Sequence, residues 1–263
     1  MENILENIAG YTRKRVAEAE KKQPREKLRA LALSQNCHTG FPFEKALAGE
    51  EMAFICECKQ ASPSKGLLVR DFPYLSIAKE YEAAGASCIS VLTEPHWFLG
   101  SPEHLAQIAD TVSIPCLRKD FTVDDYMIYE AKILGASAVL LICSLLDTDT
   151  LRQYLALCDR LGLSALVEAH DEKEIQSAVA AGARIIGVNN RNLKDFTVNL
   201  ENSKRLRKLV PDTVLFVAES GIQNAQDIQE LQKARVDAVL IGETLMRATD
   251  KKQRLAQLRG KSK

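Results

Sequence analysis

The feature that most constrains the fold of this 263-residue chain is a short unit that recurs along it. In most copies a helical stretch ends in glycine and a small residue, an aliphatic strand follows, and a polar residue ends the strand. Glycine suits the helix end because it enters the left-handed conformation without a Cβ penalty. The last copy has Arg235 instead, so its cap is expected to close differently. The copies are AAGASCISVLTE (83–94), ILGASAVLLICS (133–144), RLGLSALVEAH (160–170), AAGARIIGVNN (180–190) and KARVDAVLIGE (233–243).

Eight strands are predicted in all, each followed by a helical pattern. They are too apolar to alternate, which is typical of a parallel sheet buried on both faces. Eight βα units in a chain of this length predict an α/β fold, the (β/α)₈ TIM barrel. An open doubly wound sheet is the alternative, but its G-x-G-x-x-G first turn is missing. The strands are expected at 53–59, 87–92, 113–118, 137–142, 163–168, 184–189, 213–218 and 236–241.

Residues 1–48 predict a helical N-terminal extension packed on the barrel of residues 49–263. No Pro/Gly/Ser-rich linker divides the rest, so residues 1–263 are expected to form a single domain. Later helices carry start signals: Ser101 before a proline, the Asp171-x-x-Glu174 pattern, and Thr122. The apolar positions expected to pack the extension are Ile4, Ile8, Val16, Leu28, Leu31 and Leu33.

Composition excludes several classes of function. Thirty-five basic and 35 acidic residues give no net charge, which argues against a general nucleic-acid surface. The N-terminus lacks a secretory signal, and no apolar stretch approaches the ~18 residues needed to span a bilayer. Seven scattered cysteines, mostly in apolar segments, favour a reducing compartment, so a cytoplasmic protein is expected. Cys56 and Cys58 have no second Cys/His cluster at ligand spacing, so no metal is expected.

The first predicted strand ends in an acid and a base. Because side chains alternate across a strand, Glu57 and Lys59 share one face, while Cys56 and Cys58 share the other. The loop that follows, residues 62–66, joins serines to a glycine. It is either a mobile lid over a bound ligand or a plain solvent loop.

The ends of the predicted strands carry polar residues. In a TIM barrel the active site lies at the C-terminal ends of the strands, so these residues are expected to meet on one rim. Salt bridges and caps explain any single position, but a functional cluster better explains so many at once. In chain order they are Glu57 and Lys59, Thr93–Glu94, Arg118–Lys119–Asp120, Cys143–Ser144, Glu168, Asn189–Asn190–Arg191, Glu219–Ser220–Gly221 and Gly242–Glu243.

Two glycines just past the last two strands suggest a phosphate site. Gly221 and Gly242 each precede a helix, where backbone N–H groups can approach an anion closely; tight turns are the alternative explanation. Glu243 would repel phosphate, so its side chain is expected to turn away while its N–H faces the ligand. Replacing Gly242 by Asp is expected to raise KM with little loss of folding.

The motifs together resemble those of a known family. ECKQASPSKG (57–66) is similar to the E-x-K-x-x-S-P-S-x-G signature of the indole-3-glycerol phosphate synthases. The match covers about residues 50–248 and the helical extension. The resemblance implies ring closure of 1-(2-carboxyphenylamino)-1-deoxyribulose 5-phosphate with loss of CO₂ and water, in tryptophan biosynthesis, without a cofactor. The other blocks, in the same order, are VLTEPHWFLGS, LRKDF, LVEAH, GVNNRNL, AESGI and IGETLMRA.

The resemblance also implies roles. Lys119 would be the general acid of ring closure, and Lys59 would hold the substrate carboxylate. The sequence leaves open whether Lys59 shares the role of general acid. Glu168 would act as acid/base in removing the hydroxyl, and Glu57 would orient Lys59. Catalytic hydrogen bonds to the substrate would come from Asn189 and Ser220, and further substrate contacts from Ser62, Phe98, Phe121, Trp97, Arg191, Glu219, Gly221, Gly242 and Glu243.

Several expectations complete the hypothesis. Gln60 and Leu99 depart from the family pattern without touching the acid or base. His170 follows Glu168 by two positions, but a loop or capping role is favoured because no partner side chain for it follows from the sequence.

The expected binding partner of the protein is a small phosphorylated substrate, with no nucleic acid or membrane, and the protein is expected to be a monomer or weak oligomer. The alternative functions are phosphoribosylanthranilate isomerase and a non-catalytic phosphate-binding barrel.

Overall fold

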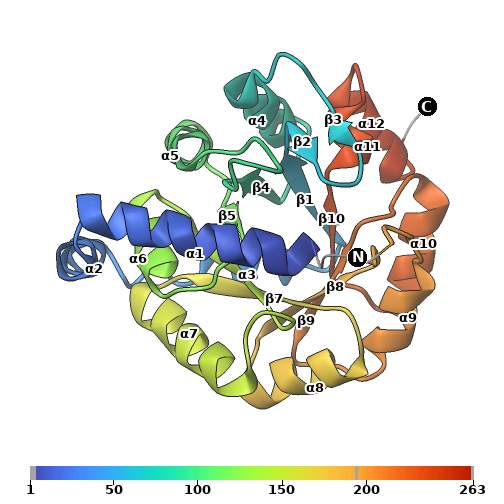
Figure 1. The fold of residues 1–263 in the computed structure, drawn as a ribbon. Helices are drawn as coiled ribbons and strands as arrows, with labels where there is room; N and C mark the ends of the chain where they lie inside the picture. The colour runs from blue at the N-terminus through green and yellow to red at the C-terminus, as the bar shows by residue number, and fades with distance from the viewer. Residues whose placement is uncertain (1–3, 193–194, 262–263) are drawn as a thin grey trace.

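Eight parallel strands close into a barrel that helices surround (Figure 1). The computed structural model describes residues 4–192 and 195–261, so Leu193 of the GVNNRNL block lies outside the described residues. The strands pair in the order β1-β10-β9-β8-β7-β6-β5-β4, and β4 pairs with β1 to complete the circle. The predicted TIM barrel is therefore confirmed. Its strands are β1 (Ala53–Cys58), β4 (Cys88–Leu92), β5 (Cys116–Lys119), β6 (Ala138–Ile142), β7 (Ser164–Ala169), β8 (Ile185–Asn189), β9 (Leu215–Glu219) and β10 (Ala238–Ile241).

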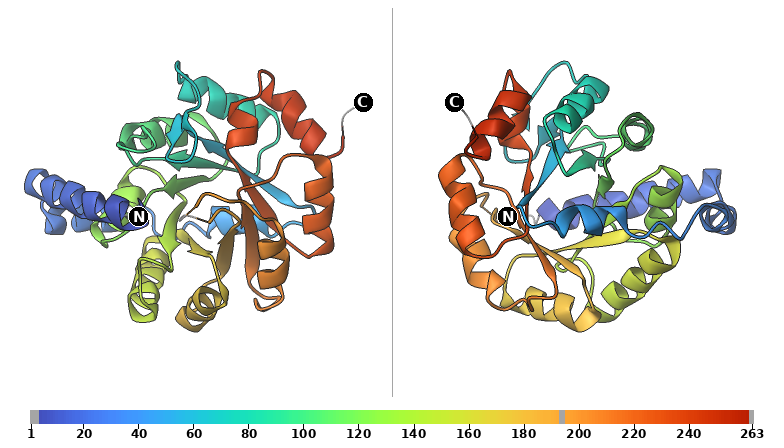
Figure 2. Two further views of the ribbon diagram at one scale, coloured as in Figure 1. Left: turned by 45° about the vertical axis from the view of Figure 1, so that its right-hand side comes forward. Right: turned by 180° about the vertical axis from the view of Figure 1, so that it is seen from behind.

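A helix follows each barrel strand, and two follow the last. The two additional views show the helices forming an outer ring (Figure 2). None of the described helices is long and apolar enough to cross a membrane. In chain order the ring consists of α4 (Tyr74–Ala83), α5 (Pro102–Thr111), α6 (Tyr126–Ile133), α7 (Thr148–Leu161), α8 (Glu172–Ala181), α9 (Glu201–Arg207), α10 (Ala225–Lys233), α11 (Glu243–Met246) and α12 (Lys251–Leu258).

Each strand divides its side chains between the barrel interior and the helix layer. On β1, Ile55 belongs to the interior cluster, while Cys56 and Cys58 belong to the cluster beneath the helices. Glu57 therefore points inward at the C-terminal end of the strand, as the alternation predicts.

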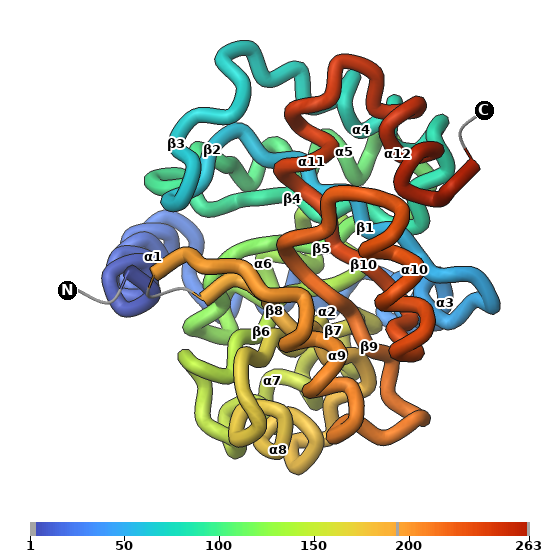
Figure 3. Tube along the Cα trace, turned by 90° about the vertical axis from the view of Figure 1, so that its right-hand side faces the viewer, coloured from blue at the N-terminus to red at the C-terminus, as the bar shows by residue number. Residues whose placement is uncertain are grey.

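The N-terminal extension covers both ends of the barrel. Its helices are α1 (Ile4–Lys22), α2 (Arg25–Ser34) and α3 (Pro42–Leu47). Figure 3 shows α1 and α3 at opposite ends, with α1 at the end where the strands terminate. Phe43 and Leu47 of α3 are fully buried and join the interior cluster, so α3 closes the other end.

The predicted packing of the extension is right for some positions and wrong for others. Ile8, Val16 and Leu28 are buried as expected. Leu31 and Leu33 are 45% and 49% exposed, so the prediction that they pack on the barrel is wrong. The buried residues of α2 are Leu28 and Ala32, four residues apart on the face that packs toward α6. Leu31 and Leu33 directly precede and follow Ala32, so the helix turns both side chains away from the centre of that face.

Two of the three predicted helix starts are confirmed. Ser101 caps α5, and Asp171 caps α8 by accepting a backbone N–H. Thr122 is not a cap, because α6 begins only at Tyr126.

The last repeat closes like the others although it lacks glycine. Arg235 has a φ of 60°, in the left-handed region. The Val236 N–H then donates to the Leu231 carbonyl, the pattern that also closes α8 after Gly182. The expectation that this cap closes differently is wrong.

Gly162 joins the extension to the barrel. It ends α7 with a φ of 67°, and a Cβ at this position would overlap the Cys37 carbonyl oxygen. The Thr39 hydroxyl donates a 2.6 Å hydrogen bond to the Gly162 carbonyl. The absent side chain therefore lets the segment between α2 and α3 lie directly against the helix end.

Gly162→Ala should lower the free energy of unfolding more than the matched change Gly182→Ala. Both glycines have positive φ, but nothing lies within 4 Å of a Cβ at Gly182. Each change should cost about 1 kcal/mol from backbone strain, and Gly162→Ala about 1 kcal/mol more from overlap with Cys37. Urea unfolding of the two variants measures the difference. Equal losses would contradict the contact.

Candidate active site

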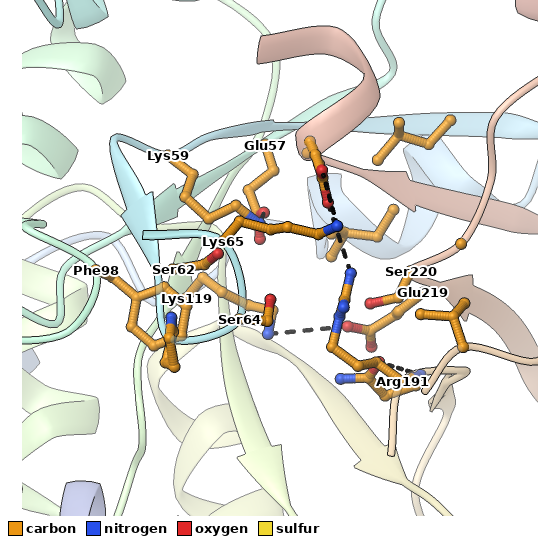
Figure 4. A pocket seen from close by; sticks show the side chains of 18 of the residues that line it. Glu57, Lys59, Ser62, Ser64, Lys65, Phe98, Lys119, Arg191, Glu219 and Ser220 are labelled. Atoms are coloured by element: carbon orange, nitrogen blue, oxygen red, sulfur yellow. Dashed lines mark hydrogen bonds and ion pairs between the residues drawn. The ribbon is translucent and has the colours of Figure 1, made fainter. Parts of the chain in front are cut away.

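A cavity of about 550 Å³ opens at the C-terminal end of the strands (Figure 4). The cavity is lined by all six predicted catalytic residues, and by eight of the residues predicted to contact the substrate. They are Glu57, Lys59, Lys119, Glu168, Asn189 and Ser220, with Ser62, Phe98, Phe121, Arg191, Glu219, Gly221, Gly242 and Glu243. The structure thus brings these positions together from segments far apart in the sequence. Sequence analysis missed the apolar residues that α1 adds to the wall, Ile4, Leu5 and Ile8, and the polar residues Gln223, Thr244, Arg247 and Arg254.

Glu57 and Lys59 form an ion pair within this cavity. The Lys59 Nζ lies 2.5 Å from Glu57 Oε2, and both side chains are largely shielded from solvent. Figure 4 shows their charged ends converging. The acid and base at the end of the first strand therefore share one face and contact each other, as predicted.

Lys119 lies between carboxylates from other strands. Its Nζ is 3.4 Å from Glu168 Oε2 and 3.8 Å from Glu219 Oε2. Burial alone would lower the pKa of Lys119, but the negative charges of Glu168, Glu219 and Glu57 raise it above its ordinary value. The ammonium is therefore held in its charged form.

The two carboxyls beside Lys119 differ in protonation. Burial opposes ionisation of Glu168, but Lys119 and then His170 lower its pKa below the ordinary range. Burial and the neighbouring Glu168 raise the pKa of Glu219 to about 8. The Lys119 ammonium lies closer to Glu168 than to Glu219, so it stabilises a negative charge on Glu168 more strongly. Glu168 is therefore ionised and Glu219 is protonated near neutral pH.

His170 contacts Glu168, a contact that sequence analysis missed. Its Nε2 lies 3.4 Å from Glu168 Oε1, and its Nδ1 lies 3.0 Å from Glu174 Oε2. Burial would lower the pKa of His170, but these two carboxylates raise it to about 10. The spacing of two between Glu168 and His170, with Glu174 four residues later, was the signal available in the sequence.

Glycines make room for the buried carboxylates. A Cβ at Gly242 would overlap Glu57 Oε2 and lie 2.9 Å from Lys59 Nζ. A Cβ at Gly187, in the middle of β8, would overlap Glu219 Oε1. Gly187 was not predicted as a site residue, and its role follows from the close approach of a side chain on the adjacent strand.

Glu243 does not turn away from the cavity, so that expectation is wrong. Its carboxylate lies 3.7 Å from Lys65, 3.7 Å from Arg191 and 3.2 Å from Arg247. Three cations converge beside the two glycine turns and attract the acidic side chain. Figure 4 shows Lys65 reaching across the cavity toward Arg191.

The 62–66 loop lies over the cavity rather than out in solvent. It forms a hairpin in which β2 (Ala61–Ser62) pairs antiparallel with β3 (Gly66–Leu67). Ser62 to Lys65 line the cavity, and Lys65 joins the loop to Glu243. This placement favours the lid over the plain solvent loop.

Phe98 and Phe121 form an aromatic wall, with ring centroids 5.9 Å apart. The buried Glu94 carboxylate organises the loop that carries Phe98 by accepting the backbone N–H groups of residues 96, 97 and 98. Trp97 packs on Tyr11 instead, with centroids 5.5 Å apart, so the prediction that it walls the cavity is wrong.

Fold and site define the class of protein: a TIM-barrel enzyme with paired acids and bases at the barrel mouth. Among the described residues no group of three or more His, Cys, Asp or Glu side chains could hold a metal ion. A family model described as indole-3-glycerol phosphate synthase matches residues 5–258. The chain belongs to the indole-3-glycerol phosphate synthase family.

Relatives support this membership along the whole chain. The protein named indole-3-glycerol phosphate synthase from Ruminiclostridium cellulolyticum is 57% identical over 98% of this chain and 99% of its own length. Its namesake from Lachnoclostridium phytofermentans is 47% identical over 97% and 98%. Among solved structures, thiamine phosphate pyrophosphorylase from Pyrococcus furiosus has a TM-score of 0.60 at 17% identity, covering 83% of this chain and 96% of its own. That likeness shows the fold alone.

Gly242→Ala should lower kcat as well as raise KM, in contrast to the binding effect expected from the sequence. The added Cβ would displace Glu57 and Lys59 besides crowding the turn. We expect kcat to fall by about 10-fold or more, because small misplacements of catalytic groups cost that much. Steady-state kinetics measures it, with Gly10→Ala as the control because a Cβ there meets nothing within 4 Å. A change confined to KM would contradict the displacement.

Glu219→Gln should change how stability depends on pH. In the folded protein the pKa of Glu219 is raised from 4.5 to about 8, so its contribution to stability is present below pH 4.5 and is lost as pH rises toward 8. Glutamine cannot ionise and lacks this loss. The stability of the variant relative to wild type should therefore rise across that range, by at least about 1 kcal/mol, the value of one pKa unit. Urea unfolding at several pH values tests this; a constant difference would refute it.

Proposed function

We propose that the residues of this cavity divide among them the chemical steps of the indole-3-glycerol phosphate synthase reaction. That reaction, a carboxy-lyase step of tryptophan biosynthesis, closes 1-(2-carboxyphenylamino)-1-deoxyribulose 5-phosphate to indole-3-glycerol phosphate with loss of CO₂ and water. The observation that carries the proposal is the position of Lys119, 3.4 Å from Glu168 and 3.8 Å from Glu219 in a cavity that also contains Gly221 and Gly242.

Lys119 is the general acid of ring closure. The substrate ketone must gain a proton as the aromatic carbon attacks it, and an ammonium supplies both the proton and a positive charge for the developing alkoxide. Surrounding carboxylates keep Lys119 charged before the step. Lys59 pairs with one carboxylate, that of Glu57 at 2.5 Å, whereas Lys119 faces the carboxyl groups of both Glu168 and Glu219.

Lys59 binds the substrate carboxylate, and Glu57 orients the Lys59 ammonium. An ammonium held by one carboxylate can accept a second anionic partner because it has three donors. Gly242 adjoins both side chains, so the carboxylate subsite and the phosphate turn share one boundary.

Glu168 is the acid/base of dehydration. The hydroxyl formed by ring closure must leave as water, which requires a proton, and a neighbouring carbon must then lose one. Glu168 lies beside Lys119 and is shielded from solvent, so both groups can act on the same part of the substrate.

The remaining residues bind and enclose the substrate. Gly221, Gly242 and Ser220 border the phosphate, and Asn189 with Arg191 contacts the sugar-phosphate chain. Phe98 and Phe121, with Ser62 of the lid, enclose the anthranilate ring. Asn190 holds this arrangement by donating to the Glu219 carbonyl at 3.0 Å and accepting from Ser203 at 2.8 Å.

Family membership and the acid-base cluster favour this function over both alternatives. Phosphoribosylanthranilate isomerase performs proton transfer without decarboxylation, and a non-catalytic barrel needs no lysine acid. Neither alternative explains a lysine enclosed by three glutamates.

The protein is further proposed to work as one unit of residues 1–263, because Ile4, Leu5 and Ile8 of the extension line the same cavity as the barrel residues. A cytoplasmic location, a monomeric or weakly oligomeric state and the lack of a nucleic-acid partner stay predictions.

Lys119→Ala should lower kcat by about 100- to 10,000-fold, the contribution of a general acid, while KM changes much less. Indole absorbance and released CO₂ measure the reaction, and Lys79→Ala, on the exposed surface of α4, is the control. Turnover at the wild-type rate would remove Lys119 from the mechanism. Indole product without CO₂ would contradict the overall reaction.

A further inference from the structure

A second groove adjoins the active-site cavity on the side of β7. It has a volume of about 600 Å³, and Leu5, Asn189 and Arg191 line both spaces. His170 lies in its wall and is partly exposed there. Glu168 lines the active-site cavity on the other side, so the His170–Glu168 contact connects the groove to the site of chemistry.

The His170 ring is held in one orientation between the two spaces. Glu174 Oε2 accepts the His170 backbone N–H at 2.7 Å and contacts ring Nδ1 at 3.0 Å, so one carboxylate fixes both backbone and ring. Ser144 Oγ lies 3.4 Å from the same Nδ1. The other nitrogen, Nε2, is buried without a hydrogen-bond partner among the described residues and faces Glu168 Oε1 at 3.4 Å.

The reaction needs a proton from outside. Its substrate carboxylate leaves as neutral CO₂, so the balance is substrate plus one proton giving product, CO₂ and water. Within the site, the ketone oxygen takes one proton, the departing hydroxyl takes a second, and the ring carbon releases one. The released proton replaces the one that Lys119 gave, so one proton per turnover must come from water.

We propose that His170 relays this proton from the groove to Glu168, which passes it to the departing hydroxyl. The inference rests on the role proposed for Glu168. His170 Nε2–H gives its proton to Glu168 Oε1, the ionised carboxylate becomes an acid, and the neutral imidazole regains a proton from water in the groove. His170 thus acts through Glu168 and does not touch the substrate.

The charges around His170 keep the proton on its ring at rest, and transfer to Glu168 becomes favourable only as the departing hydroxyl takes that proton while its C–O bond breaks. Glu168 contacts it from β7, Glu174 from α8, and the groove also contains Asp171 and Arg191. The two contacting carboxylates raise the pKa of His170 to about 10, so the ring carries a proton at rest. Glu168 alone has no proton to give, because Lys119 and His170 hold its pKa low.

His170→Asn tests the relay, with His170→Gln as a second variant and the exposed His38→Asn as the matched control. Without the relay, kcat should fall by about 10-fold or more, a smaller loss than the roughly 100-fold or more expected for a general acid, because His170 acts through Glu168. KM should stay within about twofold, because His170 does not contact the substrate. Millimolar imidazole, which fits the groove, should restore part of kcat in proportion to its concentration, and His38→Asn should behave as wild type.

Two results would overturn the relay: unchanged kcat in His170→Asn, or a lowered kcat that imidazole does not raise although circular dichroism shows a folded protein. The second result would mean that His170 only orients Glu168. Glu168→Gln separates failure of the relay from failure of the proposed function. If that variant turns over normally, the role of Glu168 falls and the relay with it; if it is inactive while His170→Asn is fully active, only the relay falls.

Discussion

Ion pairs between two lysine ammonium groups and several buried carboxyl groups stabilise the mouth of this barrel. Glu57, Lys119, Glu168 and Glu219 come from β1, β5, β7 and β9. Glu57 and Glu168 have cationic partners just past their own strands, Lys59 and His170, whereas Lys119 and Glu219 meet only across the barrel. Only closure of the sheet brings Lys119 to the carboxylates of β7 and β9. Since an unpaired buried charge costs several kcal/mol, barrel closure and the ionisation states of the site depend on each other.

The barrel interior accommodates these groups by omitting side chains. Interior positions below the site are filled by aliphatic residues such as Ile55, Leu117 and Leu166, which exclude water from the lower barrel. At the level of the carboxylates, Gly187 and Gly242 leave the space that Glu219 and Glu57 occupy. The same absent Cβ at Gly242 also exposes backbone at a turn suited to an anion. Gly242 therefore both leaves space for Glu57 and exposes backbone to an anion, so replacing it should change kcat and KM together.

Much of the fold and the site could be predicted because both depend on local patterns. Strand alternation placed Glu57 and Lys59 on one face, and barrel topology placed the strand ends on one rim. Contacts between distant segments could not be predicted. The approach of Glu219 to Gly187, the ion pairs of Glu243 and the packing of Trp97 on Tyr11 depend on the exact rotation of neighbouring elements. His170 was underestimated for a different reason: its partners Glu168 and Glu174 are close in the sequence, but periodicity does not reveal which way the ring turns after the strand ends.

The N-terminal extension takes part in this balance of charges. Arg15 of α1 donates to Asp120 Oδ1 at 2.7 Å and to the Thr93 carbonyl at 3.2 Å. Asp120 is fully buried and directly follows Lys119. Through Arg15 the extension therefore binds the strand end that carries the proposed general acid. Arg118 lies 3.4 Å from the other Asp120 oxygen, and burial of the carboxylate is offset by these two guanidinium groups, which lower its pKa. Because α1 also lines the cavity, its docking both encloses the substrate and fixes the backbone beneath Lys119. The extension therefore belongs to the catalytic structure, and loosening it should disturb chemistry and binding together.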